Sequence, residues 1–315
     1  MLQLSIIIVS YNTCQILDNC LASVCACIDR LRTEIIVVDN ASSDDSVHMV
    51  RGRYPHVHLI INEANRGFAA ANNQAITVAR GKYILLLNSD TIVLDDVLAS
   101  CIRYMDEHPD VGAMGCRVLN RDRTLQLTCS QEPTFLNLLL LTTGLWRLNR
   151  PRWFGRYQMK HWDRADERDV EVISGCYLLV RREVVDEVGL LDENFFFFGE
   201  ETDWCKRMRK AGWKLRLAPV GEIIHYGSAS ALSLGHERDL LLTNGLIRYH
   251  LKHSGMLTAV AVWMLLLCFN ISRCVYWTIR SLCTSDPDTH KRRQHFSDII
   301  RAYMKTWPTQ TSIRT

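Results

Sequence analysis

The sequence predicts an α/β protein with a mostly parallel central sheet. Short runs of β-branched residues alternate with segments of helical periodicity, polar residues follow the ends of these runs, and 48% of the 315 residues are apolar. Continuous apolar runs are typical of strands buried on both faces, and their alternation with helices predicts right-handed crossover units. Ligands bind such sheets at the carboxyl ends of the strands.

The first third of the chain supplies most of this pattern. Four runs are interpreted as strands: Leu4–Ser10, Glu34–Asp39, His58–Asn62 and Tyr83–Asp90. Apolar residues at helical spacing, or small residues, predict helices over residues 16–31, Gly67–Ala79 and Leu94–His108. The result is a doubly wound half with helices between its strands.

The periodicity weakens after the run Val111–Val118. We predict a hairpin turn at Asn120–Thr124, a mobile loop over Trp146–Arg168, an ordered stretch over Val170–Arg181 followed by a short helix, a helix over Glu201–Ala211 closed by Gly212, and short strands at Lys214–Ala218 and Ile223–His225. We expect a catalytic domain over residues 1–235 and a helical, membrane-associating region over 236–315.

The segment Ser254–Ser272 has no charged residue and is flanked by Lys252, His253 and Arg273. A membrane span needs about 20 apolar residues, so this segment either spans a bilayer, lies in its interface or forms a core helix. Trp263 and Trp277 suit interfacial anchors, and residues 280–315 carry seven Lys/Arg against three Asp. This excess predicts attachment to the anionic cytoplasmic face of the inner (plasma) membrane, peripherally or through the apolar segment.

Bulk composition excludes several classes of protein. A formal net charge of +3 is too small to favour nucleic acid as a partner. The 12 cysteines include no pair of CxxC motifs, which argues against zinc, and most lie in apolar runs, as expected for reduced thiols. The N-terminus reads as a strand rather than a signal peptide.

Three polar clusters lie at or just beyond the ends of predicted strands, and one of them also opens a helix. Asp39 ends the second strand, where a carboxylate can accept from a base or a ribose hydroxyl, although a helix cap is the alternative. The sequence Asn65-Arg66-Gly67 opens a small-residue helix that could approach a phosphate, or simply pack tightly. Asn88-Ser89-Asp90 places a carboxylate where a divalent cation could bridge to a diphosphate, or where it caps the next helix.

The fourth cluster lies in FFFFGEETDWCKR, residues 195–207. Glu200 and Glu201 are adjacent carboxylates beside an apolar wall, which should raise their pKa values and favour general-base chemistry. The alternative is a solvated helix start, which suits Asp203 better than either glutamate. His225 is a candidate site residue only because it occurs together with these acidic clusters, since a single histidine on a strand is more often structural.

In combination these motifs resemble the inverting glycosyltransferases of family 2, with the GT-A fold. The motifs SIIIVSYN, VVDNASSDDS, NRGFAAANNQA with LLLNSDT, and GCYLLVRR through FFFFGEETDWCKR to IIHYGSAS occur in the family's order over about residues 3–230. The NSDT and EExDxCxR forms are similar to bacterial rhamnosyltransferases that act in O-antigen and cell-wall polysaccharide biosynthesis.

The resemblance implies roles for individual residues. It implies Glu201 as general base, supported by Glu200 and Asp203, and a Mg²⁺ or Mn²⁺ cofactor held by Asp90 and His225. It places the nucleotide sugar against Ser10, Tyr11, Asn12, Asp39, Asn40, Asn65, Arg66, Gly67, Asn88 and Asp90, and the acceptor against Gly175, Cys176 and Trp204. Asn88 departs from the family's Asp-x-Asp pattern, and a glutamate stands at 201 where an aspartate is usual.

The implied function is metal-dependent transfer of a hexose, with rhamnose from dTDP-rhamnose as the expected donor, onto a lipid-linked or cell-surface glycan. UDP- or GDP-linked donors, and a non-catalytic module that binds nucleotide sugars or glycans, are the alternatives. A Rossmann-type dinucleotide enzyme is disfavoured, because SYNTCQ rather than GxGxxG follows the first strand.

Overall fold

The computed structural model describes residues 2–28, 31–147, 152–227 and 234–309. The chain forms two compact units. Unit 1 comprises Met1–Glu132, Gln158–Glu193 and Glu200–Ser230, and unit 2 comprises Pro133–Tyr157, Asn194–Gly199 and Ala231–Thr315. The division near residue 231 lies close to the predicted domain boundary, but unit 2 also takes in two earlier segments.

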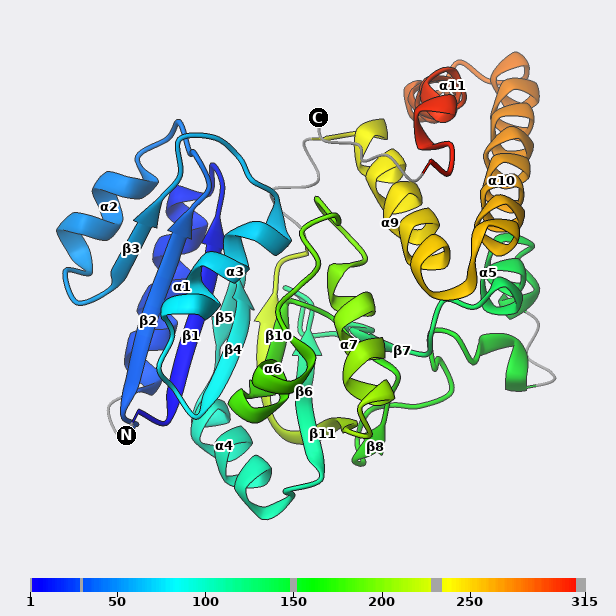
Figure 1. The fold of residues 1–315 in the computed structure, drawn as a ribbon. Helices are drawn as coiled ribbons and strands as arrows, with labels where there is room; N and C mark the ends of the chain where they lie inside the picture. Colours follow the sequence, from blue (N-terminus) through cyan, green and yellow to red (C-terminus); the bar gives the residue numbers. More distant parts are fainter. Residues whose placement is uncertain (1, 29–30, 148–151, 228–233, 310–315) are drawn as a thin grey trace. The chain divides into compact units, whose positions relative to one another are not determined.

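Unit 1 is built on one large sheet, ordered β3-β2-β1-β4-β10-β6-β11-β5 with β8 paired to β11 (Figure 1). Its strands are β1 (Leu4–Ser10), β2 (Thr33–Asp39), β3 (His58–Ile61), β4 (Tyr83–Asn88), β5 (Thr91–Val93), β6 (Val111–Leu119), β8 (Arg168–Asp169), β10 (Tyr177–Arg181) and β11 (Lys214–His225). A small second sheet pairs β7 (Cys129–Ser130) with β9 (Val172–Ile173). The first four strands in the order are parallel, and β10 and β5 run antiparallel to their neighbours.

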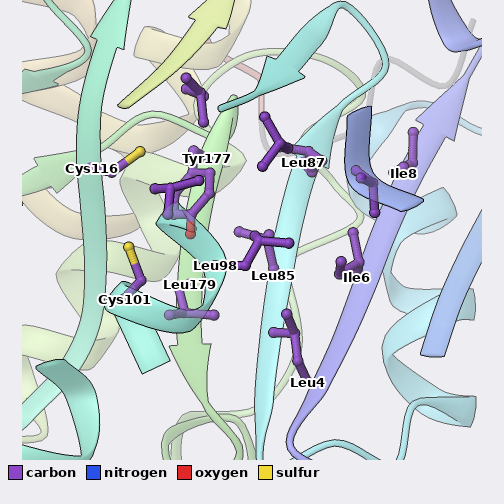
Figure 2. Close-up of a cluster of buried hydrophobic side chains, with 14 of the residues drawn as sticks. Leu4, Ile6, Ile8, Leu85, Leu87, Leu98, Cys101, Cys116, Tyr177 and Leu179 are labelled. Carbon is purple, nitrogen blue, oxygen red and sulfur yellow. The ribbon is translucent and has the colours of Figure 1, made fainter. Parts of the chain in front are cut away.

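Helices cover both faces of the sheet, as the continuous apolar strands require. One core contains residues of α1 (Cys14–Cys27), α2 (Ser46–Arg53) and α4 (Val97–Glu107), and the other contains residues of α3 (Phe68–Val78), α6 (Arg182–Val188) and α7 (Glu200–Lys210). Figure 2 shows the first core, in which Leu4, Ile6 and Ile8 of β1 point the same way. Ile7 belongs to the other core, because successive side chains of a strand point to opposite faces of the sheet.

The strand ends lie at one edge of the sheet. In the parallel pairings Ser10 lies opposite Asp39, and Val9 lies opposite Asn88. Because β10 is antiparallel to β4, the turn that precedes Tyr177 reaches the same edge. The sequence therefore delivers its polar clusters to one place, as the rule for parallel sheets predicts.

Three expectations need correction. The predicted strand Tyr83–Asp90 ends at Asn88, and a separate short strand, β5, follows. The two short strands predicted after Gly212 are one strand, β11, with an irregularity between Leu217 and Glu222. Helices α2 and α5 (Phe135–Thr142) are additional to those predicted. The hairpin turn is confirmed, since Asn120 N donates to Thr124 O at 2.8 Å.

The description of Trp146–Arg168 as a mobile loop is wrong for its second half. Trp162 and Arg164 are 4% and 1% exposed. The Arg164 guanidinium donates to the carbonyl oxygens of Gln158 at 2.9 Å and Met159 at 3.0 Å. A buried arginine whose terminal nitrogens donate to backbone carbonyls holds this irregular segment in place, which periodicity cannot reveal.

Unit 2 is helical. Besides α5 it contains the 3₁₀ turns η1 (Leu145–Arg147), η2 (Arg152–Gly155) and η3 (Tyr303–Thr306), and the helices α9 (His236–Ser254), α10 (Met256–Leu282) and α11 (Pro287–Ala302). Its core is small and contains Leu138, Leu240, Ile247, Trp263 and Tyr303 among others. In the described part of the chain, α10 alone is long and apolar enough to cross a membrane.

Candidate active site

Asp90 and His225, predicted as metal ligands, lie together. β5 pairs antiparallel with the end of β11, so that Thr91 lies opposite His225, and Tyr226 N donates to Asp90 O at 2.9 Å. This pairing brings His225 Nε2 to 3.1 Å from Asp90 Oδ1. The two residues are 7% and 5% exposed.

Gln126 fixes the tautomer of His225. His225 Nδ1 lies 2.6 Å from Gln126 Oε1, and an amide oxygen can only accept, so Nδ1 carries a hydrogen. The amide nitrogen of Gln126 in turn donates to Asn120 Oδ1 at 2.8 Å, which orients the side chain. The remaining lone pair of a neutral ring is on Nε2, the atom that faces Asp90. Such a bond to the distal nitrogen is the usual support of a metal-binding histidine.

The geometry fits a divalent cation. A carboxylate oxygen and an imidazole lone pair 3.1 Å apart repel each other unless a proton or a cation lies between them. Adjacent ligands of an octahedral ion with bonds of about 2.1 Å are about 3 Å apart. No cluster of three or more His, Cys, Asp or Glu side chains suited to a metal occurs among the described residues. A Mg²⁺ or Mn²⁺ ion held here would therefore complete its shell with diphosphate oxygens and water, as Mg²⁺ commonly does.

Asn88 is part of the same group of residues but does not replace a carboxylate. Its Nδ2 lies 3.3 Å from His225 Nε2, and its backbone N donates to Cys176 O at 3.2 Å. An amide at this position orients His225 without adding negative charge. Where the family's Asp-x-Asp pattern has two carboxylates, this site has one, Asp90, beside His225, which is far away in the sequence but 3.1 Å away in the structure.

The two carboxylate oxygens of Asp39 differ in their hydrogen bonding. The residue is 2% exposed, and its Oδ2 accepts from Ser42 N at 2.9 Å. Its Oδ1 is buried and has no hydrogen-bond partner among the described residues. A buried carboxylate oxygen without a donor is unfavourable, so a base N–H or a ribose hydroxyl is a suitable partner.

The other predicted nucleotide residues mostly brace the loops. Ser10 is buried and shares a hydrogen bond with Thr13 at 2.9 Å. Asn12 has a positive φ of 52°, and its Oδ1 accepts from Ser43 N at 2.7 Å, which ties the loop after β1 to the loop after β2. Tyr11 between them is 40% exposed and is available to stack on a base.

Asn40 organises the third loop. Its Nδ2 donates to Asn65 Oδ1 at 2.8 Å, and its Oδ1 accepts from Arg66 N at 3.0 Å. Asn65 Oδ1 also accepts from Gly67 N at 3.0 Å. Asn40 and Asn65 therefore hold the start of α3, whereas the exposed Arg66 side chain is available to an anion.

The acids of α7 differ in environment. Glu200 is 3% exposed, and burial, together with the charge of Glu201, raises its pKa well above the usual range. Glu201 is half-buried. Asp203 is fully buried and bonds to Arg207 at 2.8 Å, and Arg207 donates to the carbonyl of Val188. The alternative of a solvated helix start therefore does not apply to Asp203, and this carboxylate holds a loop.

Burial raises the pKa of the Cys176 thiol to about 12, and the charges of Asp90 and Glu201 add to the rise.

The predicted acceptor residues are mostly internal. Trp204 has no exposed surface, and its Nε1 donates to Gly189 O at 2.8 Å, so it belongs to the core rather than to an acceptor surface. Cys176 is 2% exposed and is likewise a packing residue. Gly175 lies against the Phe68 ring, and a Cβ added at this glycine would lie 3.4 Å from the ring. Gln126 is a polar group of the site that sequence reasoning missed, since only the hairpin turn before it pointed to this region.

A mostly parallel sheet with a buried carboxylate–histidine pair and an unpaired buried aspartate oxygen at its strand ends defines an α/β enzyme site. The chain belongs to the glycosyl transferase family 2, whose model matches residues 5–189. It is a glycosyltransferase with the GT-A fold, and an inverting mechanism is typical of this family.

Known relatives support this assignment. The chain is 25% identical over 282 residues to an N-acetylglucosaminyl-diphospho-decaprenol L-rhamnosyltransferase of Mycobacterium tuberculosis, an alignment that covers 83% of this chain and 89% of the relative. It is 24% identical over 227 residues to a low-salt glycan biosynthesis hexosyltransferase of Haloferax volcanii, covering 70% of this chain and 66% of the relative.

Solved structures show the same fold. The mannosyltransferase PcManGT from Pyrobaculum calidifontis, in complex with GDP-Man and Mn²⁺, superposes with a TM-score of 0.55 at 15% identity, covering 97% of this chain and 87% of that one. GalNAc-T7 with UDP, GalNAc and Mn²⁺ gives a TM-score of 0.57 at 15% identity, covering 97% and 56%.

Proposed function

We propose that this glycosyltransferase moves rhamnose from dTDP-rhamnose to a lipid-linked glycan acceptor, with inversion at the anomeric carbon. The observation that carries the proposal is the Asp90–His225 pair, 3.1 Å apart at the strand edge of a family 2 domain. The mycobacterial relative, named as a rhamnosyltransferase acting on a diphospho-decaprenol substrate, supports rhamnose as the sugar and the lipid-linked acceptor class.

Asp39 and the exposed Tyr11 would hold the nucleoside, and Arg66 would add charge toward the diphosphate. Asp90 and His225 would hold Mg²⁺ or Mn²⁺, which when bound offsets charge on the departing diphosphate. Asn88 and Gln126 would keep the imidazole oriented. With two protein ligands in place, the other coordination positions of such an ion would be left to donor oxygens or water.

Glu201 would act as the general base. The acceptor hydroxyl oxygen forms a bond to the anomeric carbon while the bond from that carbon to the diphosphate oxygen breaks, the hydroxyl proton goes to the Glu201 carboxylate, and the nucleoside diphosphate leaves. Such a base contributes roughly 10²–10⁴-fold. Burial raises the pKa of the neighbouring Glu200 well above its usual range, which favours its neutral form, so that Glu200 adds little negative charge beside Glu201.

The test is a matched pair of variants. Glu201→Gln should lose transfer by at least about 100-fold while nucleotide binding, measured by calorimetry, stays within error of the wild type. Glu200→Gln should keep most of its activity, because the proposal has this residue protonated already. Near-normal turnover in Glu201→Gln would remove the base from the mechanism.

The donor is identified separately. A panel of dTDP-, UDP- and GDP-sugars, each with Mg²⁺ or Mn²⁺, is scored for slow hydrolysis without an acceptor. dTDP-rhamnose should be hydrolysed fastest. Faster hydrolysis of a UDP- or GDP-sugar would reassign the donor, and binding without turnover against any acceptor would favour the non-catalytic module.

We further propose that the enzyme works at the cytoplasmic face of the plasma membrane, attached through unit 2. The length and composition of α10 and the basic C-terminal segment support this location. Deletion of residues 254–315 should move the protein from the membrane to the soluble fraction, and unchanged fractionation would count against it.

A further inference from the structure

Helix α10 has two opposite faces. Eight of its residues are exposed at intervals of three or four along its whole length: Leu257, Ala261, Met264, Cys268, Ile271, Val275, Ile279 and Leu282. At 100° per residue these eight fall within an arc of about 80°. We call this set the outer stripe. It is entirely apolar and contains no charged residue, which is unusual for a face in contact with water.

The opposite face of α10 is occupied by protein. Ala259, Val262, Trp263 and Leu266 are buried in the core of unit 2. The indole of Trp263 donates to Thr306 Oγ1 at 3.0 Å, and the Tyr303 hydroxyl donates to Trp263 O at 2.9 Å. These bonds lie near the middle of the apolar part of α10, so lipid cannot surround the helix there while unit 2 is folded.

The helices packed against α10 are polar. Both α9 and α11 pack along α10. Helix α11 carries the ion pair of Asp298 and Arg301 at 3.3 Å, next to Ile299, which shares the core of unit 2 with Trp263 of α10. A helix that crossed the bilayer with these partners would bring several charges to membrane depth, each of which is strongly unfavourable there.

The length of the uncharged part of α10 leads to the same conclusion. It runs from Met256 to Ser272, before Arg273, which is 17 residues or about 26 Å of helix. The hydrocarbon core of a bilayer is about 30 Å thick. A helix with one apolar face and one face committed to protein is instead suited to lying in the interface.

We propose that α10 lies parallel to the membrane surface, with the outer stripe in the acyl region and unit 2 on the cytoplasmic side of one leaflet. The partner is a bilayer surface containing anionic lipids, which the Lys/Arg excess of residues 280–315 attracts. This inference rests on the membrane attachment proposed above and specifies its geometry: the enzyme is attached to one leaflet and does not span the bilayer.

Depth measurements test the geometry in the full-length protein. Cys268 is exposed on the outer stripe, whereas most other cysteines are buried. A fluorophore is attached at Cys268, or at a cysteine replacing Leu257 or Ile279, after the other cysteines that are not buried are changed to serine. Quenching by brominated lipids at different depths then locates each position in vesicles of phosphatidylglycerol and phosphatidylcholine. The 22 residue-to-residue steps from Leu257 to Ile279 extend about 33 Å.

The proposal predicts the same shallow depth at all three positions. A spanning helix predicts that Cys268 lies deepest and that the two ends lie near opposite surfaces, and this result would overturn the proposal. The double variant Met264→Gln with Ile271→Gln should bind these vesicles roughly 100-fold more weakly. Met304→Gln, which changes an apolar residue 66% exposed on η3, is the matched control and should bind as the wild type does.

Two further readouts separate this proposal from others. Hydrolysis of a soluble nucleotide sugar should be unchanged in the double variant, so loss of vesicle binding is distinct from failure of the proposed chemistry. Sedimentation without lipid shows whether the outer stripe joins two copies of the chain. A stable dimer that Met264→Gln with Ile271→Gln dissociates, with vesicle binding unaffected, would overturn the membrane assignment.

Discussion

The bond between Gln126 and His225 leads to a quantitative prediction about metal affinity. Gln126 Oε1 accepts the Nδ1 hydrogen at 2.6 Å and thereby keeps the Nε2 lone pair directed at Asp90. In Gln126→Met this acceptor is replaced by an apolar group of similar length. Loss of such support typically weakens metal binding by 10–100-fold, or about 1.4–2.7 kcal/mol. We expect the Mn²⁺ concentration that gives half-maximal donor hydrolysis to rise by about this factor.

The assay is a Mn²⁺ titration at fixed donor, paired with calorimetric binding of Mn²⁺ in the presence of nucleoside diphosphate. At saturating Mn²⁺ the maximal rate should return to near the wild-type value, because Gln126 does not touch the reacting atoms. Gln126→Glu keeps an acceptor for Nδ1 and should retain or improve affinity. Gln74→Met, which breaks an amide pair with Asn62 elsewhere in unit 1, controls for a general loss of stability.

Two results would refute this reasoning. An unchanged Mn²⁺ dependence in Gln126→Met would show that the imidazole is not a ligand or needs no orientation. Equal losses in the methionine and glutamate variants would show that packing of the hairpin, rather than the acceptor for Nδ1, is what matters. Thermal unfolding of each variant distinguishes a local effect from unfolding of the site.

Three further variants test other parts of unit 1. Burial raises the pKa of Glu200 in the folded state, so the wild type should lose stability as the pH rises from about 4.5 through the folded-state value. Glu200→Gln should therefore melt at a higher temperature than the wild type at pH 8, and the difference should close near pH 4. Equal melting temperatures of the two proteins at both pH values would contradict the burial argument. Asp39→Asn should raise KM for the donor by about 10–100-fold with little change in kcat, since a charged hydrogen bond is lost; an unchanged KM would separate Asp39 from the nucleotide. Arg164→Met leaves several carbonyl oxygens without a donor and should lower the free energy of unfolding by on the order of 3 kcal/mol in denaturant titrations; a change under about 0.5 kcal/mol would restore the view of residues 158–168 as a loose loop.

The sheet and the position of its ligand edge could be predicted from the sequence because they depend on local features. A run such as Leu4–Ser10 is a strand in almost any α/β context, and the parallel arrangement then brings Ser10, Asp39 and Asn88 to one edge. The pairing of β5 with β11 could not be predicted, since it depends on a register between segments some 130 residues apart. The role of Gln126 is set by that register and so was also missed.

Buried polar residues explain the other differences. The burial of Arg164, inside the predicted mobile loop, and of Asp203 could not be predicted, because a buried charge is rare and its partners are not visible locally. In the structure the first donates to backbone carbonyls and the second bonds to Arg207. Polar residues are usually expected at the surface. Here the chain buries them, and their hydrogen bonds hold irregular backbone in place.

The position of Glu201 in α7 distinguishes it from its acidic neighbours. At 100° per residue it shares a face with Cys205 and Met208, which are fully buried. Yet Glu201 itself is only half-buried, because it lies in the first turn, where that inward face reaches the edge of the core. Asp203 lies about 200° around the helix from Glu201 and is bound to Arg207. Of the three acids, Glu201 alone is partly exposed, and this difference supports the proposal that it is the general base.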